Sequence, residues 1–381
     1  MSSFFTVLSL ATAAAALIVP GLGGPYAVGY STAVLTDSSR QDPYATIPQK
    51  RRVLVSAYLP VDASKAPCPK QTLPYMTPAV AAHYGQVAAQ AGLANDTFAR
   101  FEMEFCDLKK LCAKKTRGAF PVVLYDTGLG TSRSLYGVKA RNLASQGYVV
   151  VTVDHPYDAD IVEFPDGSVV ESVPFNGTEP EIVGFQNVRV QDLSFVLAQL
   201  QTSAVRRSLF AQYPSAIDFS HAAAVGHSLG GVASVLLASQ QPRFVRAGVN
   251  MDGGIHEPLL SAGSSAPTMQ FGRAGHGETD PSWDALWPRL RGPAAELALA
   301  NATHGTFTDV LTLAEPFMAG LPAEVVAGLK EGYGSIEPRE AEKAIVGGLL
   351  AALEFAFEGK SEGVESIHDK YASLVVVRSH L

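Results

Sequence analysis

Short apolar segments alternate with longer segments of helical periodicity from about residue 50 onward. The apolar segments, such as 120–125 and 148–153, lack polar alternation, which is typical of strands buried on both faces of a sheet. Between them, apolar side chains recur three and four positions apart, as from Leu193 to Leu200, which predicts helices with one buried face. Strands that alternate with helices favour parallel pairing, so we expect an α/β fold with a doubly wound, mostly parallel sheet and helices on both faces.

The same patterns place the individual elements. We expect strands at 52–61, 120–125, 148–153, 222–225, 244–251, 267–271 and 294–300, and helices at 78–93, 132–145, 183–202, 229–239 and about 345–357. Residues 156–182 carry Pro, Gly and Asp at short intervals and predict a hairpin or loop excursion. We interpret residues 23–381 as one domain, with a cysteine-bearing insertion at about 62–118.

The N-terminal segment reads as a secretory signal. The run from Phe4 to Val19 is nearly all apolar or small and breaks at Pro20, which makes it too short to span a bilayer. Small residues at 13–16 offer a cleavage site, so we interpret residues 1–22 as a signal peptide. No Lys or Arg precedes the run, and a buried N-terminal strand or helix is the alternative. We expect a secreted, extracellular protein with no transmembrane segment in the mature chain.

Two further features bear on secretion. The mature chain is expected to begin between Leu17 and Gly24. Asn95, Asn176 and Asn301 each open a glycosylation sequon, although such triplets also arise by chance.

Three cysteines, Cys68, Cys106 and Cys112, lie in the first third of the chain. An odd number permits one disulfide and one free thiol, or an intermolecular bridge. Because Cys106 and Cys112 would face different sides of a regular helix, we favour a bridge from the loop that holds Cys68. No Cys/His cluster has zinc spacing, so neither a metal nor another cofactor is implied.

Composition narrows the function classes. Hydrophobic residues make up 47% and charged residues 17%, which supplies a large core and excludes a disordered chain. Acidic residues exceed basic residues by 36 to 29, so the chain has no basic surplus and nucleic acid is not expected as a partner.

The strongest chemical signal is Gly226-His227-Ser228-Leu229-Gly230, which follows a short predicted strand and opens a predicted helix. A serine hydroxyl is a weak nucleophile unless a sharp turn presents it beside a base. Glycines flank the serine of such an elbow because side chains there would collide with the neighbouring strand and helix. We therefore interpret Ser228 as a nucleophile rather than part of an ordinary glycine turn.

The second signal is Gly128-Leu129-Gly130, just after the strand predicted at 120–125. A tetrahedral intermediate places negative charge on the former carbonyl oxygen, which backbone N–H groups can stabilise. One donor follows the nucleophile, and the other lies in an earlier strand–helix loop. We expect Leu229 and Leu129 in these roles; the alternative for the second is a tight turn.

An acid and a base must complete the constellation, in the order serine, acid, histidine. Asp252 ends a predicted strand 24 residues after Ser228, where open α/β sheets place ligands. Asp280, Asp284 and Asp309 are the alternatives. Asp309 is also a candidate for a residue that contacts a member of the triad without being its acid.

His304 is our candidate for the base, because it lies in a loop after the strand predicted at 294–300. His276, in a Gly-rich segment, is the alternative. The remaining histidines lie before the nucleophile, beside it, too close to the acid, or near the C-terminal helix.

Together these segments resemble the platelet-activating factor acetylhydrolase family of α/β-hydrolases, especially its secreted fungal-type members. The resemblance rests on Gly24-Pro25-Tyr26-Ala27-Val28-Gly29, Gly128-Leu129-Gly130-Thr131-Ser132-Arg133, Asp154-His155-Pro156-Tyr157-Asp158, the serine elbow with Gly231, Met251-Asp252-Gly253 and Thr303-His304-Gly305-Thr306-Phe307-Thr308-Asp309. It implies an α/β-hydrolase fold and a triad of Ser228, Asp252 and His304, with oxyanion donors at Leu129 and Leu229. It also implies metal-free hydrolysis of short or oxidised sn-2 acyl groups of phospholipids, as by a 1-alkyl-2-acetylglycerophosphocholine esterase.

One departure from the family pattern concerns the oxyanion loop. Family members often have His or Pro immediately before Gly-Leu-Gly, whereas this chain has Asp126-Thr127. A carboxylate that pointed toward the oxyanion would oppose the developing charge, and we expect reduced or redirected activity in that case.

The leading function is therefore a secreted serine esterase acting on short acyl esters of phospholipids. Alternatives are a general carboxylesterase, lipase or polyester hydrolase, an acyltransferase, and a non-catalytic binding module on the same fold. The apolar segment 310–330 is interpreted either as helices packed on the sheet or as a lid in transient contact with a lipid surface.

Overall fold

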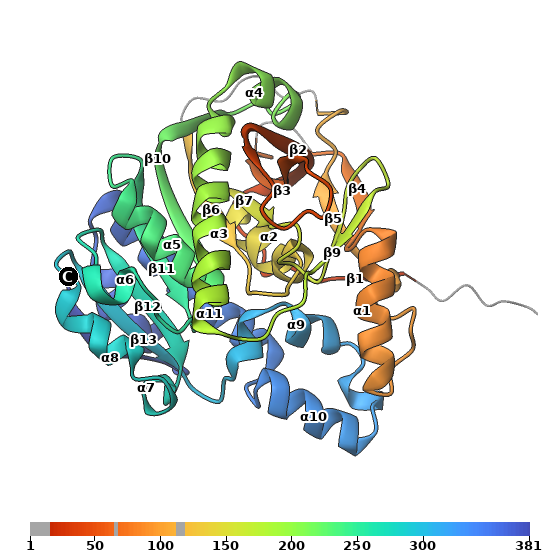
Figure 1. The fold of residues 1–381 in the computed structure, drawn as a ribbon. Coiled ribbons are helices and arrows are strands. Elements are labelled where there is room, and N and C mark those ends of the chain that lie inside the picture. Colours follow the sequence, from red (N-terminus) through yellow and green to blue (C-terminus); the bar gives the residue numbers. More distant parts are fainter. Residues whose placement is uncertain (1–15, 65–67, 112–118) are drawn as a thin grey trace, which may run out of the picture.

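A twelve-stranded sheet forms the centre of the computed structural model, which describes residues 16–64, 68–111 and 119–381 (Figure 1). Its strands are β1 (Leu17–Ile18), β2 (Ala27–Gln41), β3 (Lys50–Val61), β4 (Lys70–Pro74), β5 (Phe101–Cys106), β6 (Ala119–Asp126), β7 (Val149–Asp154), β10 (Ala216–His227), β11 (Val245–Met251), β12 (Thr268–Arg273), β13 (Ala294–Leu299) and β14 (Leu374–His380). The order is β1-β5-β2-β3-β7-β6-β10-β11-β12-β13-β14, with β4 beside β5. The six strands from β7 to β13 in this order are parallel.

Helices cover both faces of this sheet. They are α1 (Pro78–Gln90), α2 (Gly137–Ser145), α3 (Glu179–Leu200), α4 (Ser203–Leu209), α5 (Leu229–Gln240), α6 (Leu259–Ala262), α7 (His276–Thr279), α8 (Ser282–Leu286), α9 (Val310–Ala314), α10 (Ala323–Tyr333), α11 (Pro338–Glu358), α12 (Glu362–Glu365) and α13 (Ile367–Lys370). The predicted α/β class with a mostly parallel sheet is confirmed.

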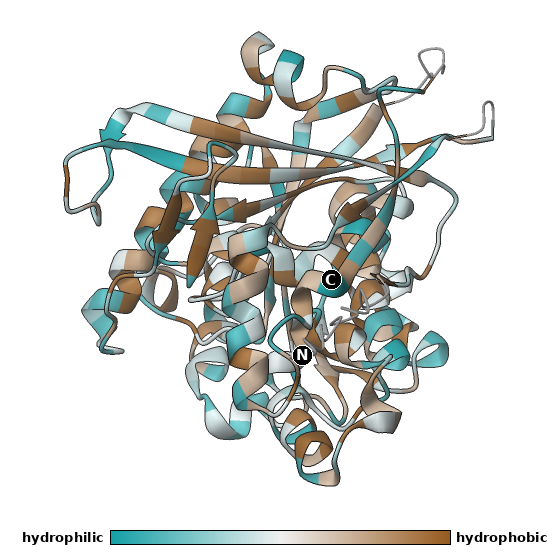
Figure 2. Cartoon of the chain, turned by 90° about the vertical axis from the view of Figure 1, so that its right-hand side faces the viewer, coloured by the Kyte–Doolittle hydropathy of each residue, from teal (hydrophilic) through white to brown (hydrophobic). Residues whose placement is uncertain are grey.

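Alternation along the central strands separates two hydrophobic cores. On β6, Val123 and Tyr125 pack on the face covered by α2 and α11, whereas Val122 and Leu124 pack on the face covered by α3 and α5. Successive side chains of a strand point to opposite faces, so a strand without polar alternation must be buried on both. Figure 2 accordingly shows several sheet strands coloured as hydrophobic along most of their length.

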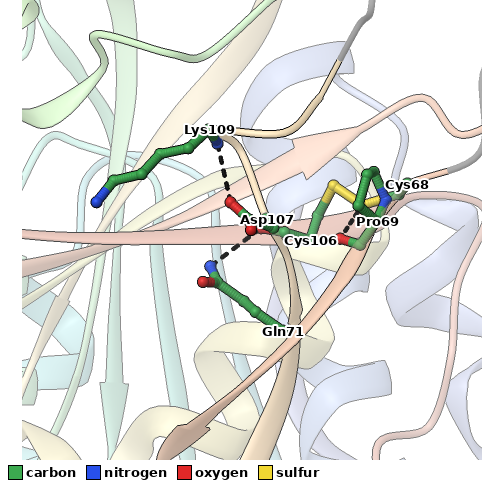
Figure 3. Close-up of a disulfide and its surroundings, with 6 residues drawn as sticks. All are labelled: Cys68, Pro69, Gln71, Cys106, Asp107 and Lys109. Atoms are coloured by element: carbon green, nitrogen blue, oxygen red, sulfur yellow. Dashed lines mark hydrogen bonds between the residues drawn. A yellow bond between two sulfur atoms is a disulfide. The ribbon is translucent and has the colours of Figure 1, made fainter.

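The expected insertion at 62–118 contributes the strands β4 and β5 to the sheet and the helix α1, which lies outside the sheet. β4 pairs antiparallel with β5, and α1 lies between them in sequence. A disulfide joins Cys68 to Cys106, beside Gln71 and Asp107 (Figure 3). The bridge starts from the loop that the sequence favoured; Cys112 lies outside the described residues.

The ends of the sheet differ from the sequence expectation. At one end, β2 and β3 pair antiparallel. At the other end, β14 pairs antiparallel with β13, so His380 lies on a strand where the sequence indicated a helix or a tail beyond it. Both β2 and β14 lie outside the parallel centre and carry partly exposed residues, and their mixed sequences lack the continuous apolar run of a buried strand. None of the described helices is long and apolar enough to cross a membrane.

The first described strand, β1, begins at Leu17. Residues 1–15, which hold most of the predicted signal peptide, lie outside the described residues. β1 pairs with β5, the Val19 amide donates to the Glu102 carbonyl at 2.8 Å, and Arg141 donates to the Val19 carbonyl at 3.0 Å. A mature chain that starts at Leu17 keeps these contacts, whereas one that starts at residue 23 loses them.

Candidate active site

Ser228 stands on a strained turn between β10 and α5. Its φ is +55°, a left-handed conformation that costs free energy in a residue other than glycine. The flanking glycines permit the turn: a Cβ on Gly226 would lie 2.2 Å from the Gly230 carbonyl oxygen, and one on Gly230 would lie 2.3 Å from that of Thr127. The turn exposes Ser228 to a cavity of about 390 Å³.

His304 and Asp252 are brought together beside this serine. Asp252 follows β11, and His304 begins a single 3₁₀ turn, η4 (His304–Phe307), in the segment after β13. The Nδ1 atom of His304 lies 2.8 Å from Oδ2 of Asp252, and His304 lines the same cavity as Ser228. With Nδ1 donating to the carboxylate, Nε2 carries the lone pair that a general base requires.

Asp252 is held as a carboxylate. Burial raises its pKa, but hydrogen bonds from His276, His304 and the Arg273 amide outweigh burial, and the net pKa lies far below its usual range. The Arg273 guanidinium adds a contact of 2.8 Å. A carboxylate that stays ionised keeps the proton on Nδ1 of His304.

His276, the alternative base, contacts Asp252 from the other side. Its Nδ1 lies 2.8 Å from Oδ1 of Asp252, and its buried ring packs on Trp283 with centroids 3.9 Å apart. It is absent from the described residues that line the cavity of Ser228. The sequence missed His276 as a second partner of the acid, because its Gly-rich setting carried no sign of where the ring would point.

The three alternative acids make other contacts. Asp280 lies 3.5 Å from Nε2 of His276, and Asp284 pairs with Arg378 at the surface. Asp309 is buried and pairs with Lys139 at 3.2 Å. None of these contacts involves His304.

The Gly128-Leu129-Gly130 loop follows β6 and reaches the same cavity. Leu129 lines the cavity with Ser228, and Leu229 is the first residue of α5. The Gly128 amide is engaged elsewhere, since it donates to the Tyr136 hydroxyl at 2.9 Å. The amides expected to serve as oxyanion donors therefore lie on the two segments that border the nucleophile.

Asp126, the departure from the family pattern, does not line this cavity among the described residues. Its carboxylate is fully buried and accepts hydrogen bonds from His155 at 2.8 Å, from Arg189 at 3.1 Å and from the Thr127 amide at 2.8 Å. Burial raises its pKa, but the charges of His155 and Arg189 outweigh burial and lower it. The negative charge is compensated behind the loop, so the expected opposition to an oxyanion does not arise from this geometry.

The same buried cluster holds the oxyanion loop by its backbone. Arg189 donates to the carbonyl oxygens of Thr127 and Gly128. His155 bridges Asp126 and Asp192, with its second nitrogen 2.9 Å from the latter. An imidazole between two carboxylates must donate from both nitrogens, which requires the protonated form. Burial lowers the pKa of His155, but the two carboxylates outweigh burial and raise it to about 9.

The cavity walls come largely from α1 and from the segment after the base. Val87 of α1 and Leu329 and Tyr333 of α10 face the cavity. Phe317, between α9 and α10, instead packs against Phe101 with ring centroids 5.7 Å apart. The segment 310–330 thus combines packing residues with residues that border the cavity.

The three sequon asparagines Asn95, Asn176 and Asn301 are exposed. Their glycosylation stays a prediction. Among the described residues, no group of three or more His, Cys, Asp or Glu side chains could hold a metal ion.

Comparisons with known proteins give consistent matches. The family model described as platelet-activating factor acetylhydrolase, isoform II, matches residues 17–169. A protein of Arthroderma benhamiae named "Probable 1-alkyl-2-acetylglycerophosphocholine esterase" is 31% identical over 369 residues, which cover 91% of this chain and 90% of that protein. The platelet-activating factor acetylhydrolase of Gallus gallus is 21% identical over 316 residues, which cover 71% of this chain and 68% of that protein.

Among solved structures, a ferulic acid esterase from Streptomyces cinnamoneus superposes with a TM-score of 0.76 at 25% identity. The match covers 96% of this chain and 100% of that protein.

Proposed function

Because this chain belongs to the platelet-activating factor acetylhydrolase family and is a carboxylic ester hydrolase, we propose that it is a secreted serine esterase that removes short sn-2 acyl groups from phospholipids. One observation carries the catalytic part of this proposal. Ser228 and His304 line one cavity, and Nδ1 of His304 is 2.8 Å from the buried carboxylate of Asp252. These are the parts that a serine nucleophile requires.

In the proposed reaction, Nε2 of His304 takes the proton of Ser228 as Oγ attacks the ester carbonyl. The negative charge that forms on the carbonyl oxygen is stabilised by the amides of Leu129 and Leu229, and Asp252 stabilises the imidazolium. The alcohol then leaves with the proton from His304, and the acyl group remains on Ser228. Water, activated by His304, releases the acid and restores the serine.

The cavity favours short acyl groups. Its volume of about 390 Å³ must hold both the acyl group and part of the alcohol, and its walls are largely apolar. An acyl chain that exceeds the enclosed space must leave apolar surface in water or displace α1 or α10, and both cost free energy.

Two features of the chain support secretion, a disulfide and an apolar N-terminal segment. The Cys68–Cys106 disulfide is of a kind that persists in oxidising compartments. The apolar residues before the first strand match a signal peptide in length and composition.

A general carboxylesterase, lipase or polyester hydrolase is the second candidate. The likeness to a protein named a ferulic acid esterase supports it, because that protein has a similar fold and its name mentions ferulic acid and no phospholipid. The two candidates share the same chemistry and differ in the alcohol and acyl groups that the cavity admits.

A panel of esters tests the proposal. Acetyl, butyryl and palmitoyl esters of a soluble alcohol and of a phosphocholine lipid are compared in the wild type, Ser228→Ala and Ser239→Ala. Ser239 lies near the far end of α5, so Ser239→Ala is the matched control. The proposal predicts hydrolysis of the acetyl phospholipid by the wild type and the control alone. Faster hydrolysis of soluble or long-chain esters than of the acetyl phospholipid would favour the second candidate.

A further inference from the structure

The hydroxyl of Tyr136 lies where the oxyanion loop meets the turn of the nucleophile. Tyr136 ends the 3₁₀ turn η2 (Arg133–Tyr136), which leads into α2, and its side chain is fully buried. Its hydroxyl oxygen lies 2.9 Å from the Gly128 amide, 3.0 Å from Oγ1 of Thr131 and 2.9 Å from Nδ1 of His227. It therefore contacts both segments that carry an expected oxyanion donor.

The contacts with Gly128 and Thr131 constrain the peptide that presents the Leu129 amide. In a trans peptide the N–H and C=O groups point in opposite directions, so the Gly128 carbonyl sets the direction of the Leu129 amide. This carbonyl accepts hydrogen bonds from Oγ1 of Thr131 at 2.8 Å and from Arg189 at 3.1 Å. The Tyr136 hydroxyl contacts that same Thr131 and accepts from the Gly128 amide, so it constrains the peptides on both sides of the glycine.

The contact with His227 reaches the residue just before the nucleophile. The ring of His227 is buried, faces the ring of His304 with centroids 4.5 Å apart and stacks on Phe307. Burial and the charge of His304 lower the pKa of His227 well below its usual value, so the ring stays neutral and its Nδ1 can accept a hydrogen bond from Tyr136. Leu229 follows two residues later on the same turn, so this contact constrains the second donor segment.

The three polar groups also converge on Gly128. A Cβ on this glycine would lie 3.1 Å from the Tyr136 hydroxyl, 3.2 Å from Nδ1 of His227 and 3.3 Å from Oγ1 of Thr131. These separations are shorter than an optimal van der Waals contact, so a side chain at this position would displace the groups. The glycine thus permits the oxyanion loop to approach the hydroxyl closely.

We propose that Tyr136 is a positioning residue that holds the two segments of the oxyanion site in a fixed relative position. Its single hydroxyl fixes the Leu129 amide relative to the Leu229 amide. The inference rests on the proposed esterase mechanism, because it presupposes that these two amides stabilise the oxyanion. Tyr136 is absent from the described residues that line the cavity, so it acts through the loop and the turn and not on the substrate.

Single-turnover hydrolysis of 4-nitrophenyl acetate tests this role in Tyr136→Phe, which removes the hydroxyl and keeps the ring. With enzyme in excess, the dependence of the rate on enzyme concentration separates the acylation rate constant from the dissociation constant of the ester complex. The acylation rate constant is expected to fall roughly ten- to hundredfold, which is less than the loss of a whole oxyanion donor. The dissociation constant should stay within about twofold, because the oxyanion forms only after the ester has bound.

Tyr213→Phe is the matched control, because the Tyr213 hydroxyl donates to the Pro60 carbonyl at 2.7 Å and Tyr213 does not line the cavity. This variant loses a tyrosine hydrogen bond and should keep the wild-type acylation rate constant. Equal losses of the acylation rate constant in Tyr213→Phe and Tyr136→Phe would overturn the proposal.

The pH profile separates an effect on the oxyanion site from an effect on the base. Burial raises the pKa of Tyr136 to about 12, so the hydroxyl keeps its hydrogen while His304 titrates. Tyr136→Phe should therefore lower the acylation rate constant by the same factor at each pH on the rising limb of the profile. A shifted midpoint with an unchanged plateau would overturn the proposal, because Tyr136 would then act on the base.

Variants of His227 test whether the contacts of Tyr136 form one link. The side-chain oxygen of asparagine can take the place of Nδ1 as an acceptor, so His227→Asn should retain a higher acylation rate constant than His227→Leu. Either Tyr136→Phe or His227→Leu breaks the link, so the double variant should lose less than the product of the two single effects. Effects that multiply would overturn the proposal, because the two segments would then be held independently.

The positioning role and the proposed function fail in different ways. If Ser228→Ala is acylated as fast as the wild type, or the wild type is not acylated at all, the proposed mechanism fails and the positioning role fails with it. If acylation requires Ser228 but Tyr136→Phe keeps the rate constant within about twofold, only the positioning role is wrong.

Discussion

Protonation of His155 should stabilise the fold over a defined range of pH. Both ring nitrogens face buried carboxylates, at 2.8 Å from Asp126 and 2.9 Å from Asp192, and the pKa is raised from 6.5 to about 9. Because the folded protein binds this proton more tightly than the unfolded chain, the stabilisation is complete below about pH 6.5 and is lost as the pH rises through about 9. The rise corresponds to about 3 kcal/mol of unfolding free energy.

Urea unfolding between pH 6 and pH 10 measures this contribution. The wild type should lose up to about 3 kcal/mol between pH 6.5 and pH 9, and His155→Gln should start lower and change less over that interval. His221→Gln is the control, since His221 is 40% exposed and its partners among the described residues are the nearby Asp218 and Ser220. Activity should fall over the same interval, because the cluster holds the carbonyls of Thr127 and Gly128 through Arg189. An equal pH slope in the wild type and His155→Gln would refute the reasoning.

Four further outcomes are expected. Ser228→Ala should lower kcat by several orders of magnitude without loss of the fold, as judged by thermal unfolding; retention of a tenth of the activity would contradict the assignment. His304→Ala should abolish hydrolysis, whereas His276→Ala should lower kcat less and destabilise the protein, because it removes a donor to Asp252 and leaves a cavity beside Trp283. Acetyl esters should be cleaved much faster than palmitoyl esters in a chain-length series, by roughly 1 kcal/mol for each methylene that the cavity cannot hold. N-terminal sequencing of the secreted protein should find a start at or just before Leu17; a start at residue 23 would contradict the role of β1.

The elements and the nucleophile were readable from local sequence. Continuous apolar segments predicted the central strands, because a strand covered on both faces leaves no position for a polar side chain. Gly226 marked the elbow for a similarly local reason, since a Cβ there would lie 2.2 Å from the carbonyl oxygen of Gly230, four residues later. Such constraints act within a few residues and leave a direct trace in the sequence.

The partners of the acid were decided by packing between distant segments. Asp252 and His304 could be ranked by their order along the chain. The contact of His276 with Asp252 could not, because it depends on how the segment that holds His276 packs, with its ring on Trp283. Asp126 changed meaning for the same reason. In the sequence, a carboxylate just before Gly-Leu-Gly was expected to oppose the negative charge of an oxyanion. In the fold, Arg189 of α3 and His155 compensate the charge of Asp126 on the side away from the cavity.

The α/β class, the central strands and the turn that presents Ser228 were all predictable from the chain, because periodicity and steric exclusion act locally. The antiparallel ends of the sheet and the charge cluster behind the oxyanion loop became visible in the folded chain and were not predictable from local patterns. Each of these depends on which side chains meet across gaps of tens to hundreds of residues. The electrostatic free energy of a charged group in a folded protein depends on the charges that lie near it and on how far water is excluded from it. Neither can be inferred from the residues beside it in the sequence.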